Sequence, residues 1–237
     1  MTDTLPLSGK LALVTGASRG IGAATAEALA AAGAHVILTA RTSGGLEEVE
    51  ERIHEAGGHA TIAPLDLIDG ESIGRLAQAI SGRWQALDIL VLNAATLGSL
   101  ASVPAIDAKE FARQLTLNIA APQALIAAFD TMLRGSKDAR VVALTSSVAA
   151  TPRAYWGAYG ASKAALETLV GAYGEEVKNI SAIRTHIVDP GATRTAMRAR
   201  AFPGEDPATL KEPKVAAAAI VDMILADTPT GYRTRID

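Results

Sequence analysis

The sequence contains no cysteine. Disulfide bonds, thiol nucleophiles and cysteine-bound metal sites are therefore excluded, and the composition fits a reducing compartment such as the cytoplasm. Aromatic residues make up only 4% of the chain, whereas alanine, glycine and aliphatic residues are abundant. Because small side chains let helices lie close to a sheet, this composition favours helices packed flat against parallel strands.

Basic residues are not in excess, since 22 Lys and Arg stand against 25 Asp and Glu. Proteins that follow nucleic-acid phosphates are usually basic, so we expect no nucleic-acid partner. No apolar stretch approaches the roughly 20 residues of a membrane span, and no signal peptide is recognisable, so we expect a cytoplasmic protein without a membrane partner. The four histidines show no metal-ligand spacing, and no metal site is expected.

Short apolar segments alternate with longer helical patterns along the chain. Strands are expected at Leu11–Thr15, His35–Thr39, Ala60–Ala63, Asp88–Leu92, Arg140–Thr145, Ser181–Val188 and Gly231–Ile236. Helices are expected at Ile21–Ala32, Leu46–Ala56, Ser72–Arg83, Asp107–Leu133 with a candidate kink at Pro122, Tyr159–Lys178 and Lys214–Ala226. This alternation predicts an α/β fold: a doubly wound, Rossmann-type parallel sheet of about seven strands with helices on both faces, in three α/β/α layers. We expect one domain over residues 1–237.

The one long irregular segment is Gly191–Pro213, which follows the sixth strand. Ligands bind at the carboxyl ends of the strands in such sheets, so we interpret this segment as a substrate lid, with a poorly ordered surface loop as the alternative. Tyr155, Trp156, Met197 and Phe202 flank the same region. They form either an apolar pocket wall or a subunit contact.

A glycine-rich turn, TGASRGIG over residues 15–22, joins the first strand to the first helix. Its spacing differs from the common G-x-G-x-x-G, and glycines also merely permit tight turns, so the prediction depends on its place between strand and helix. Backbone can approach a pyrophosphate there, and the helix start offers free N–H groups. We predict a dinucleotide cofactor bound by Gly16, Ser18, Arg19, Gly20, Ile21 and Gly22.

The end of the second strand, residues 39–43, carries no acidic residue. NAD-binding folds usually place Asp or Glu there to hold the ribose 2′-hydroxyl. Arg41 instead offers charge-assisted hydrogen bonds to a 2′-phosphate, with Thr42 beside it and Arg19 on the other side. We therefore predict NADP(H) rather than NAD; the alternative is that both arginines are solvated surface residues.

The chain resembles the short-chain dehydrogenase/reductase family from residue 10 to about residue 196. TGASRGIG matches the family's cofactor turn, and Tyr159-Gly160-Ala161-Ser162-Lys163 matches its Y-x-x-x-K motif. Further matches are Asn93-Ala94-Ala95 in place of Asn-Ala-Gly, Asn118 within a helix, and Pro190-Gly191 followed by Thr193 and Thr195. The resemblance implies an oxidoreductase that transfers hydride between NADP(H) and a carbonyl or alcohol substrate. It also implies that Asn93, Pro190, Gly191, Thr193 and Thr195 lie at the cofactor, with Asp66 and Leu67 near its adenine.

Tyr159 and Lys163 lie one helical turn apart and share a face. A free tyrosine has a pKa near 10, and a nearby ammonium and an oxidised nicotinamide favour the phenolate, so we predict a lowered pKa for Tyr159 and a role as general acid or base. The resemblance implies that Lys163 binds the cofactor ribose and that Asn118 holds a water linking Lys163 to solvent.

The family also uses a serine just after the fifth strand. Ser146 and Ser147 are both present, and we predict Ser146, because twelve residues separate it from Tyr159 and it directly follows the strand. Two alternatives concern other residues: Asp66 caps the next helix, and Asn93 mainly fixes the central strand.

The alternative function is a catalytically silent NADP(H)-binding regulator or assembly subunit, because fold alone does not determine function. Such a protein is expected to have lost Tyr159, Lys163 or the serine, and all three are present. The resemblance further implies a homo-oligomer. The chain stops soon after its last expected strand, which leaves homodimer and homotetramer open.

Overall fold

The computed structural model describes residues 5–237 and contains a seven-stranded parallel sheet. Its strands are β1 (Leu11–Thr15), β2 (His35–Thr39), β3 (His59–Ile62), β4 (Ile89–Leu92), β5 (Ala139–Leu144), β6 (Ile183–Asp189) and β7 (Tyr232–Arg235). Their order is β3-β2-β1-β4-β5-β6-β7. The chain adds β2 and β3 on one side of β1 and then adds β4 on the opposite side of β1. The switch point therefore lies between β1 and β4. This confirms the doubly wound α/β fold.

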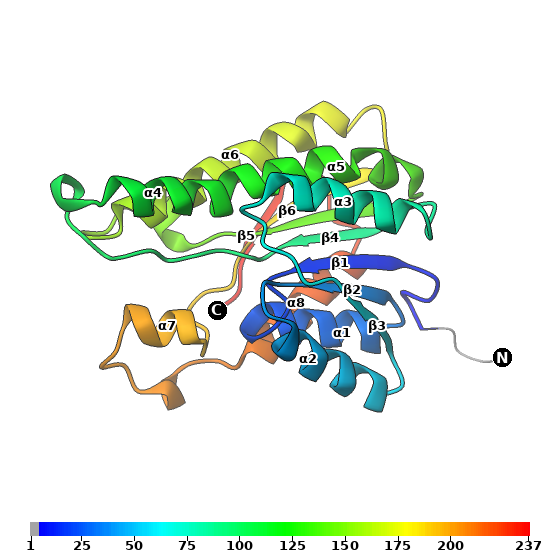
Figure 1. Cartoon of the computed structure of the whole chain (residues 1–237), viewed down its shortest axis with the longest axis horizontal. Helices are drawn as coiled ribbons and strands as arrows, with labels where there is room; N and C mark the ends of the chain where they lie inside the picture. Colours follow the sequence, from blue (N-terminus) through cyan, green and yellow to red (C-terminus); the bar gives the residue numbers. More distant parts are fainter. Residues whose placement is uncertain (1–4) are drawn as a thin grey trace.

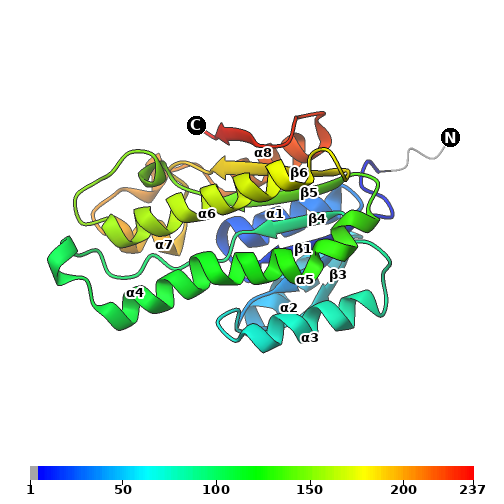
Figure 2. The same ribbon diagram turned by 90° about the horizontal axis from the view of Figure 1, so that it is seen from above.

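Helices cover both faces of the sheet (Figure 1). One face carries α1 (Gly20–Ala31), α2 (Ser43–Glu55) and α8 (Pro213–Leu225), and the other carries α3 (Gly70–Ser81), α4 (Ala108–Leu115), α5 (Ala121–Gly135) and α6 (Gly157–Val177). Each face has its own buried core, one including Leu29 and Ile220 and the other Phe129 and Val170. Figure 2 shows α4 and the start of α6 extending past the carboxyl ends of the strands. The start of α6 therefore lies where ligands bind in such a sheet.

The helix expected over Asp107–Leu133 is interrupted by a π-helical turn at Thr116–Ala120, between α4 and α5. Pro122 explains the position of this turn. It has no N–H to donate to the Asn118 carbonyl four residues earlier, and its ring crowds that carbonyl. The irregularity therefore lies ahead of Pro122 and includes Asn118. Such turns are frequent at functional sites.

The segment Gly191–Pro213 is less irregular than the sequence indicated. It contains α7 (Ala196–Ala201) and a 3-10 turn at Pro207–Thr209. The Thr195 hydroxyl caps α7 by accepting from the Arg198 N–H at 3.1 Å. Ala, Met and Arg are good helix formers, but the surrounding prolines indicated an irregular segment, so the helix was not predicted. α7 lies beside the carboxyl ends of the strands (Figure 1).

Candidate active site

The glycine-rich turn is built from backbone that only glycine adopts easily. Gly16 has φ 66° and Gly20 has φ 59°, both in the left-handed region. At Gly22 a Cβ atom would lie 2.3 Å from the Gly16 carbonyl oxygen and 2.4 Å from Asn93 Nδ2. The turn, the start of α1 and the end of β4 therefore pack in direct contact at the switch point of the sheet.

Asn93 ties β4 to β1. Its Nδ2 donates to the carbonyl oxygens of Thr15 at 2.7 Å and Gly16 at 3.2 Å. The Thr15 hydroxyl donates to the Val91 carbonyl at 3.0 Å and accepts the N–H groups of Asn93 and Ala94, also at 3.0 Å. Asn93 thus has the strand-fixing role weighed from the sequence. The sequence assigned Thr15 no role, although a threonine at the end of an apolar strand, where the glycine turn begins, was a usable signal.

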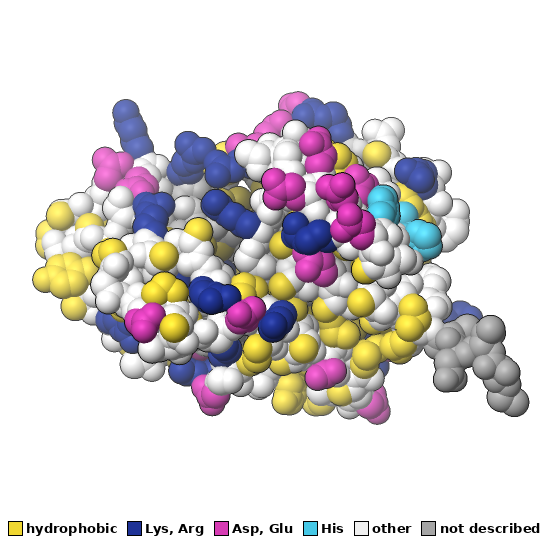
Figure 3. Space-filling view, turned by 90° about the horizontal axis from the view of Figure 1, so that it is seen from below, with side chains coloured by type: hydrophobic (Ala, Val, Ile, Leu, Met, Phe, Trp, Pro, Cys, Tyr) yellow, Lys and Arg dark blue, Asp and Glu magenta, His cyan; other side chains and the backbone are white. Residues whose placement is uncertain are grey.

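Arg19 and Arg41 are both exposed, and neither lies within 4 Å of a carboxylate of residues 5–237. The start of α2 lies against the glycine turn, because a Cβ on Gly45 would be 3.0 Å from Ser18 Cβ. Figure 3 shows Lys and Arg side chains gathered around a hollow on this side of the molecule. Two cationic groups that have no carboxylate partner in the described part of the chain therefore border the glycine turn.

Tyr159 and Lys163 project from the first turns of α6 and are 7% and 2% exposed. The Lys163 Nζ lies 5.8 Å from the centre of the Tyr159 ring and donates to the Leu144 carbonyl at 2.8 Å. Ser162, between them in sequence, accepts from Asn118 Nδ2 at 3.0 Å and donates to the Tyr159 carbonyl at 2.8 Å. Ser162 thus links Asn118 to the Tyr159 backbone, a contact that the sequence did not reveal, and Lys163 lies beside the Tyr159 ring.

The Asn118 side chain also holds the loop after β4. Its Oδ1 accepts from the Thr96 N–H and its Nδ2 donates to the Thr96 carbonyl, both at 2.9 Å. These contacts use the side chain for positioning. The Asn118 backbone carbonyl receives no hydrogen bond from Pro122, because proline has no N–H.

Both candidate serines lie close to α6. Gly160 permits this approach, because a Cβ there would be 2.8 Å from the Val148 carbonyl oxygen. Ser146 has extended backbone and Ser147 begins a 3-10 turn, and both are half-buried. The geometry places the pair beside the Tyr159 helix without choosing between them.

The pKa of Tyr159 is raised, contrary to the prediction from the sequence. Burial raises the pKa of its hydroxyl above the ordinary value of 10, and the negative charge of Asp189 raises it further. Burial lowers the pKa of Lys163 to about 8, while Glu167 opposes that change. Loss of water penalises the phenolate and the ammonium alike. The sequence reasoning counted the attraction between the two groups but not this desolvation.

Asp66 and Leu67 follow β3. Asp66 Oδ1 accepts from the Ile68 N–H at 3.1 Å, whereas Asp69 caps α3 by accepting from Glu71 N–H at 3.1 Å. The alternative that Asp66 caps this helix is therefore wrong, because Asp69 directly precedes the first turn of α3. Leu67 is 6% exposed and belongs to the core.

The segment after β6 reaches the glycine turn. Gly191 has φ 62°, and the buried Thr193 hydroxyl donates to the Pro190 carbonyl at 3.0 Å. A Cβ on Gly20 would be 3.5 Å from the Thr195 methyl group. These residues therefore lie at the same edge as the glycine turn, although Thr193 and Thr195 use their hydroxyls within the segment itself.

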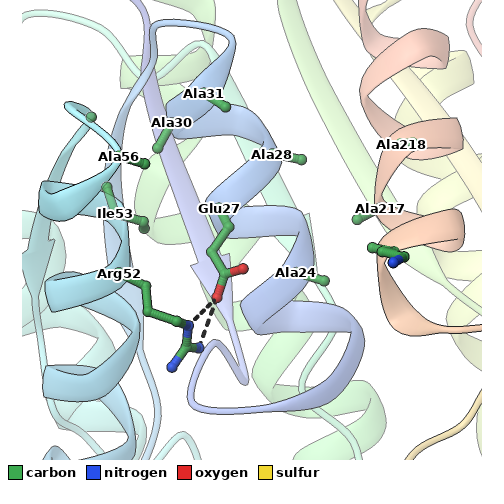
Figure 4. A pocket seen from close by; sticks show the side chains of 12 residues that line it. Ala24, Glu27, Ala28, Ala30, Ala31, Arg52, Ile53, Ala56, Ala217 and Ala218 are labelled. Carbon is green, nitrogen blue, oxygen red and sulfur yellow. Dashed lines mark hydrogen bonds and ion pairs between the residues drawn. The ribbon is translucent and has the colours of Figure 1, made fainter.

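A separate hollow of about 340 Å³ lies between α1, α2 and α8 (Figure 4). Alanine side chains line most of it, and Glu27 and Arg52 form an ion pair of 2.7 Å beside it. It contains none of the candidate site residues. Within residues 5–237, no group of three or more His, Asp or Glu side chains is placed to hold a metal ion, and no helix is long and apolar enough to cross a membrane.

The chain is similar in sequence and in structure to known proteins of one family. The family model described as short chain dehydrogenase matches residues 10–206. The uncharacterized oxidoreductase YciK of Escherichia coli is 37% identical over 210 residues, which are 87% of this chain and 82% of YciK. A short chain dehydrogenase structure from Pseudomonas syringae superposes with TM-score 0.94 at 34% identity, covering 100% of this chain and 98% of that one. A short chain dehydrogenase from E. coli CFT073, complexed with NADPH, has TM-score 0.91, 35% identity and 99% coverage of both chains.

Proposed function

The chain belongs to the short-chain dehydrogenase family and is an oxidoreductase, and on this premise we propose that it transfers a hydride between NADP(H) and a carbonyl or secondary alcohol at Tyr159. The observation that carries the proposal is the position of the Lys163 ammonium 5.8 Å from the Tyr159 ring, with Asn118 linked to the Tyr159 backbone through Ser162. No observation favours the silent regulator, since Tyr159, Lys163, Asn118 and both candidate serines are present.

The residues present fit NADP(H). Left-handed glycines and the N–H groups at the start of α1 suit a pyrophosphate. Arg19 and Arg41 are exposed, and no acidic residue stands at the end of β2 to repel a 2′-phosphate. The related enzyme complexed with NADPH supports the same choice. Ser18, Ile21, Thr42, Asp66, Leu67, Asn93, Pro190, Gly191, Thr193 and Thr195 complete the proposed cofactor site.

When bound, NADPH supplies the hydride to the carbonyl carbon. Tyr159 donates its hydroxyl proton to the carbonyl oxygen, so that an alcohol and NADP⁺ form, and the reverse reaction returns both. The positive charges of Lys163 and the oxidised nicotinamide offset the desolvation that raises the pKa of Tyr159. Lys163, with water on the Asn118 carbonyl, restores the Tyr159 proton from solvent. Ser146 donates a hydrogen bond to the substrate oxygen.

Segment Gly191–Pro213, with α7, is part of this proposal as the substrate lid of a single catalytic domain. The proposal also includes a cytoplasmic homo-oligomer, either dimer or tetramer.

The proposed hydride transfer is tested by NADPH oxidation. Purified protein should oxidise NADPH, seen as loss of absorbance at the reduced nicotinamide band, when offered ketones, aldehydes and quinones. Tight NADPH binding without turnover on any of these compounds would favour the silent regulator.

Replacing Arg41 by Asp is expected to raise the Kd for NADPH by about 100-fold, because it places a negative charge against the 2′-phosphate. The Kd for NADH should hardly change. Cofactor fluorescence titrations measure both values. Arg83→Asp, on an exposed arginine packed over Trp84, is the matched control and should alter neither. Equal losses for both cofactors in Arg41→Asp would overturn the NADP(H) assignment.

Ser146→Ala is expected to lower kcat by about 100-fold, since it removes a hydrogen-bond donor to the developing charge on the substrate oxygen. Ser147→Ala is the matched variant and should be mild. Steady-state kinetics on one ketone compare the two. If Ser147→Ala is the damaging change, the serine assignment is reversed.

Asp189→Asn tests the electrostatics of the catalytic tyrosine. Asp189 raises the pKa of Tyr159, so removal of its charge should lower that pKa. Carbonyl reduction needs the protonated hydroxyl and should fall off at a lower pH than in the unchanged protein, whereas alcohol oxidation should extend to lower pH. The pH profiles of kcat/KM in both directions measure the shift. Unchanged profiles would show that Asp189 does not act on Tyr159.

A further inference from the structure

The space in front of the Tyr159 hydroxyl is occupied by Met197. The hydroxyl lies 3.9 Å from the Met197 sulfur, which comes from α7. A substrate carbonyl has to take this position to receive the proton. Methionine is unbranched and flexible, so its side chain can move aside while the surroundings stay in place.

Apolar side chains gather around this position. Leu97, Val148 and Tyr159 form a buried cluster, with Leu100, Trp156, Met197 and Ala201 packed against it. The Trp156 ring lies edge-on to Tyr159 at 6.1 Å, and the Phe202 ring lies 5.5 Å from Trp156. The Trp156 ring therefore lies next to the place of the reacting carbonyl with Phe202 beside it, and the Arg153 guanidinium lies 5.6 Å and 5.9 Å from the centres of these two rings.

The backbone directly before Trp156 adopts a conformation that costs free energy. Tyr155 has φ 70°, a left-handed conformation that non-glycine residues rarely adopt and that is found preferentially at functional sites. The Tyr155 ring is 64% exposed, while the next residue, Trp156, packs against the buried cluster. Of the four residues left open in the sequence, Trp156, Met197 and Phe202 gather at the site and Tyr155 does not.

Cationic groups fix the aromatic pair and α7. The Arg198 guanidinium lies 3.8 Å from the centre of the Phe202 ring and pairs with Glu205 at 2.6 Å. Arg200 donates from α7 to the Gly98 carbonyl at 3.0 Å, across 102 residues of sequence. The aromatic pair is therefore held in a defined place rather than free to swing into solvent.

We propose, on the basis of the proposed function, that Trp156, Met197 and Phe202 select an apolar carbonyl compound that carries a planar ring. Its ring packs against Trp156 and Phe202, and its carbonyl replaces the Met197 sulfur in front of Tyr159. The hydride and proton then reach the carbonyl carbon and oxygen as in the proposed reaction. Polyhydroxylated ketones are rejected, because their hydroxyls lose water and find few partners in this cluster.

The test compares NADPH-dependent reduction of 2-acetonaphthone, an aryl ketone, with that of dihydroxyacetone. The unchanged protein should have a kcat/KM at least about 100-fold higher for the aryl ketone. Met197→Gln, of similar size but polar, should lower the aryl ketone value by about tenfold and so reduce the preference for the aryl ketone, whereas Met197→Leu should keep the preference. Phe202→Ala should raise the aryl ketone KM, and Tyr232→Ala, which removes an exposed aromatic ring on β7, should not.

A binding measurement separates this inference from the proposed function. The chain has two tryptophans, so in a Trp84→Phe background Trp156 alone reports on the pocket. 2-Acetonaphthone should quench its fluorescence saturably, about tenfold more weakly after Phe202→Ala, and dihydroxyacetone should not. Saturable quenching without turnover of any carbonyl would overturn the proposed function and leave the pocket inference standing. Turnover without a preference for the aryl ketone, or no saturable quenching, would overturn the pocket inference.

Discussion

Tyr159→Phe is expected to lower kcat for carbonyl reduction by about 1,000-fold, because a positioned general acid typically contributes between about 100-fold and 10,000-fold. The substitution removes one oxygen atom and keeps the buried ring. Among residues 5–237 the hydroxyl has a single hydrogen-bond contact, to the weakly accepting Met197 sulfur at 3.9 Å, so the fold should lose little stability. The Kd for NADPH should stay near its original value. Single-turnover absorbance kinetics with saturating NADPH and one ketone measure the loss at the chemical step.

Tyr173→Phe on the same helix is the matched control. The Tyr173 hydroxyl donates to Asp130 Oδ1 at 2.7 Å, at a place where the sequence and structure show no candidate site residue. Its removal should cost about 2 kcal/mol of unfolding free energy, as for hydrogen bonds to charged groups, and leave kcat intact. Retention of a tenth of the activity in Tyr159→Phe would show that another group supplies the proton.

Gly22→Ala is expected to destabilise the fold by roughly 3 kcal/mol, because overpacking of a tight contact has a cost of this size. The same substitution is expected to abolish measurable NADPH binding. The new methyl group would lie 2.3 Å from the Gly16 carbonyl oxygen and 2.4 Å from Asn93 Nδ2. Neither atom can retreat freely. One belongs to the backbone of the turn, and the other already donates to the Thr15 carbonyl at 2.7 Å. Urea unfolding and fluorescence titration with NADPH measure the two effects.

Gly74→Ala provides the matched control. Gly74 lies exposed within α3, and a Cβ there meets no atom within 4 Å. Alanine is favoured over glycine inside a helix by about 1 kcal/mol, so this variant should gain stability and bind NADPH as before. If Gly22→Ala were equally stable and bound NADPH normally, the close packing of the turn against Asn93 would not be needed for cofactor binding.

The strands were predicted well because a buried parallel strand is a continuous apolar run that can be read locally. β1 and β2 have the predicted bounds, and β3, β4 and β5 differ by a single residue at one or both ends. The helix over Asp107–Leu133 was harder, because the π-helical turn depends on how Pro122 meets the preceding carbonyl. α7 was missed because neighbouring prolines outweighed a short helical stretch of six residues.

The candidate site was likewise predicted only in part from the sequence. Motif spacing was enough to name Tyr159, Lys163 and Asn118 as candidates, since Y-x-x-x-K puts two groups on one helix face. It gave no sign that Ser162 links Asn118 to the Tyr159 backbone, because that contact joins residues 44 positions apart. It also missed the direction of the Tyr159 pKa, because desolvation depends on what the whole fold packs around the hydroxyl.

The sequence alone determined the succession of the seven strands along the chain, most of the helices between them, the glycine turn, the absence of an acid after β2 and the Tyr159–Lys163 pair. All of these depend on neighbours within a few residues. Only the tertiary structure decided that Asn93 fixes β1 to β4, that Met197 stands before the Tyr159 hydroxyl, and that Trp156 and Phe202 form one aromatic wall. Burial and contacts between distant segments, such as Arg200 with Gly98, arise only when the chain has folded.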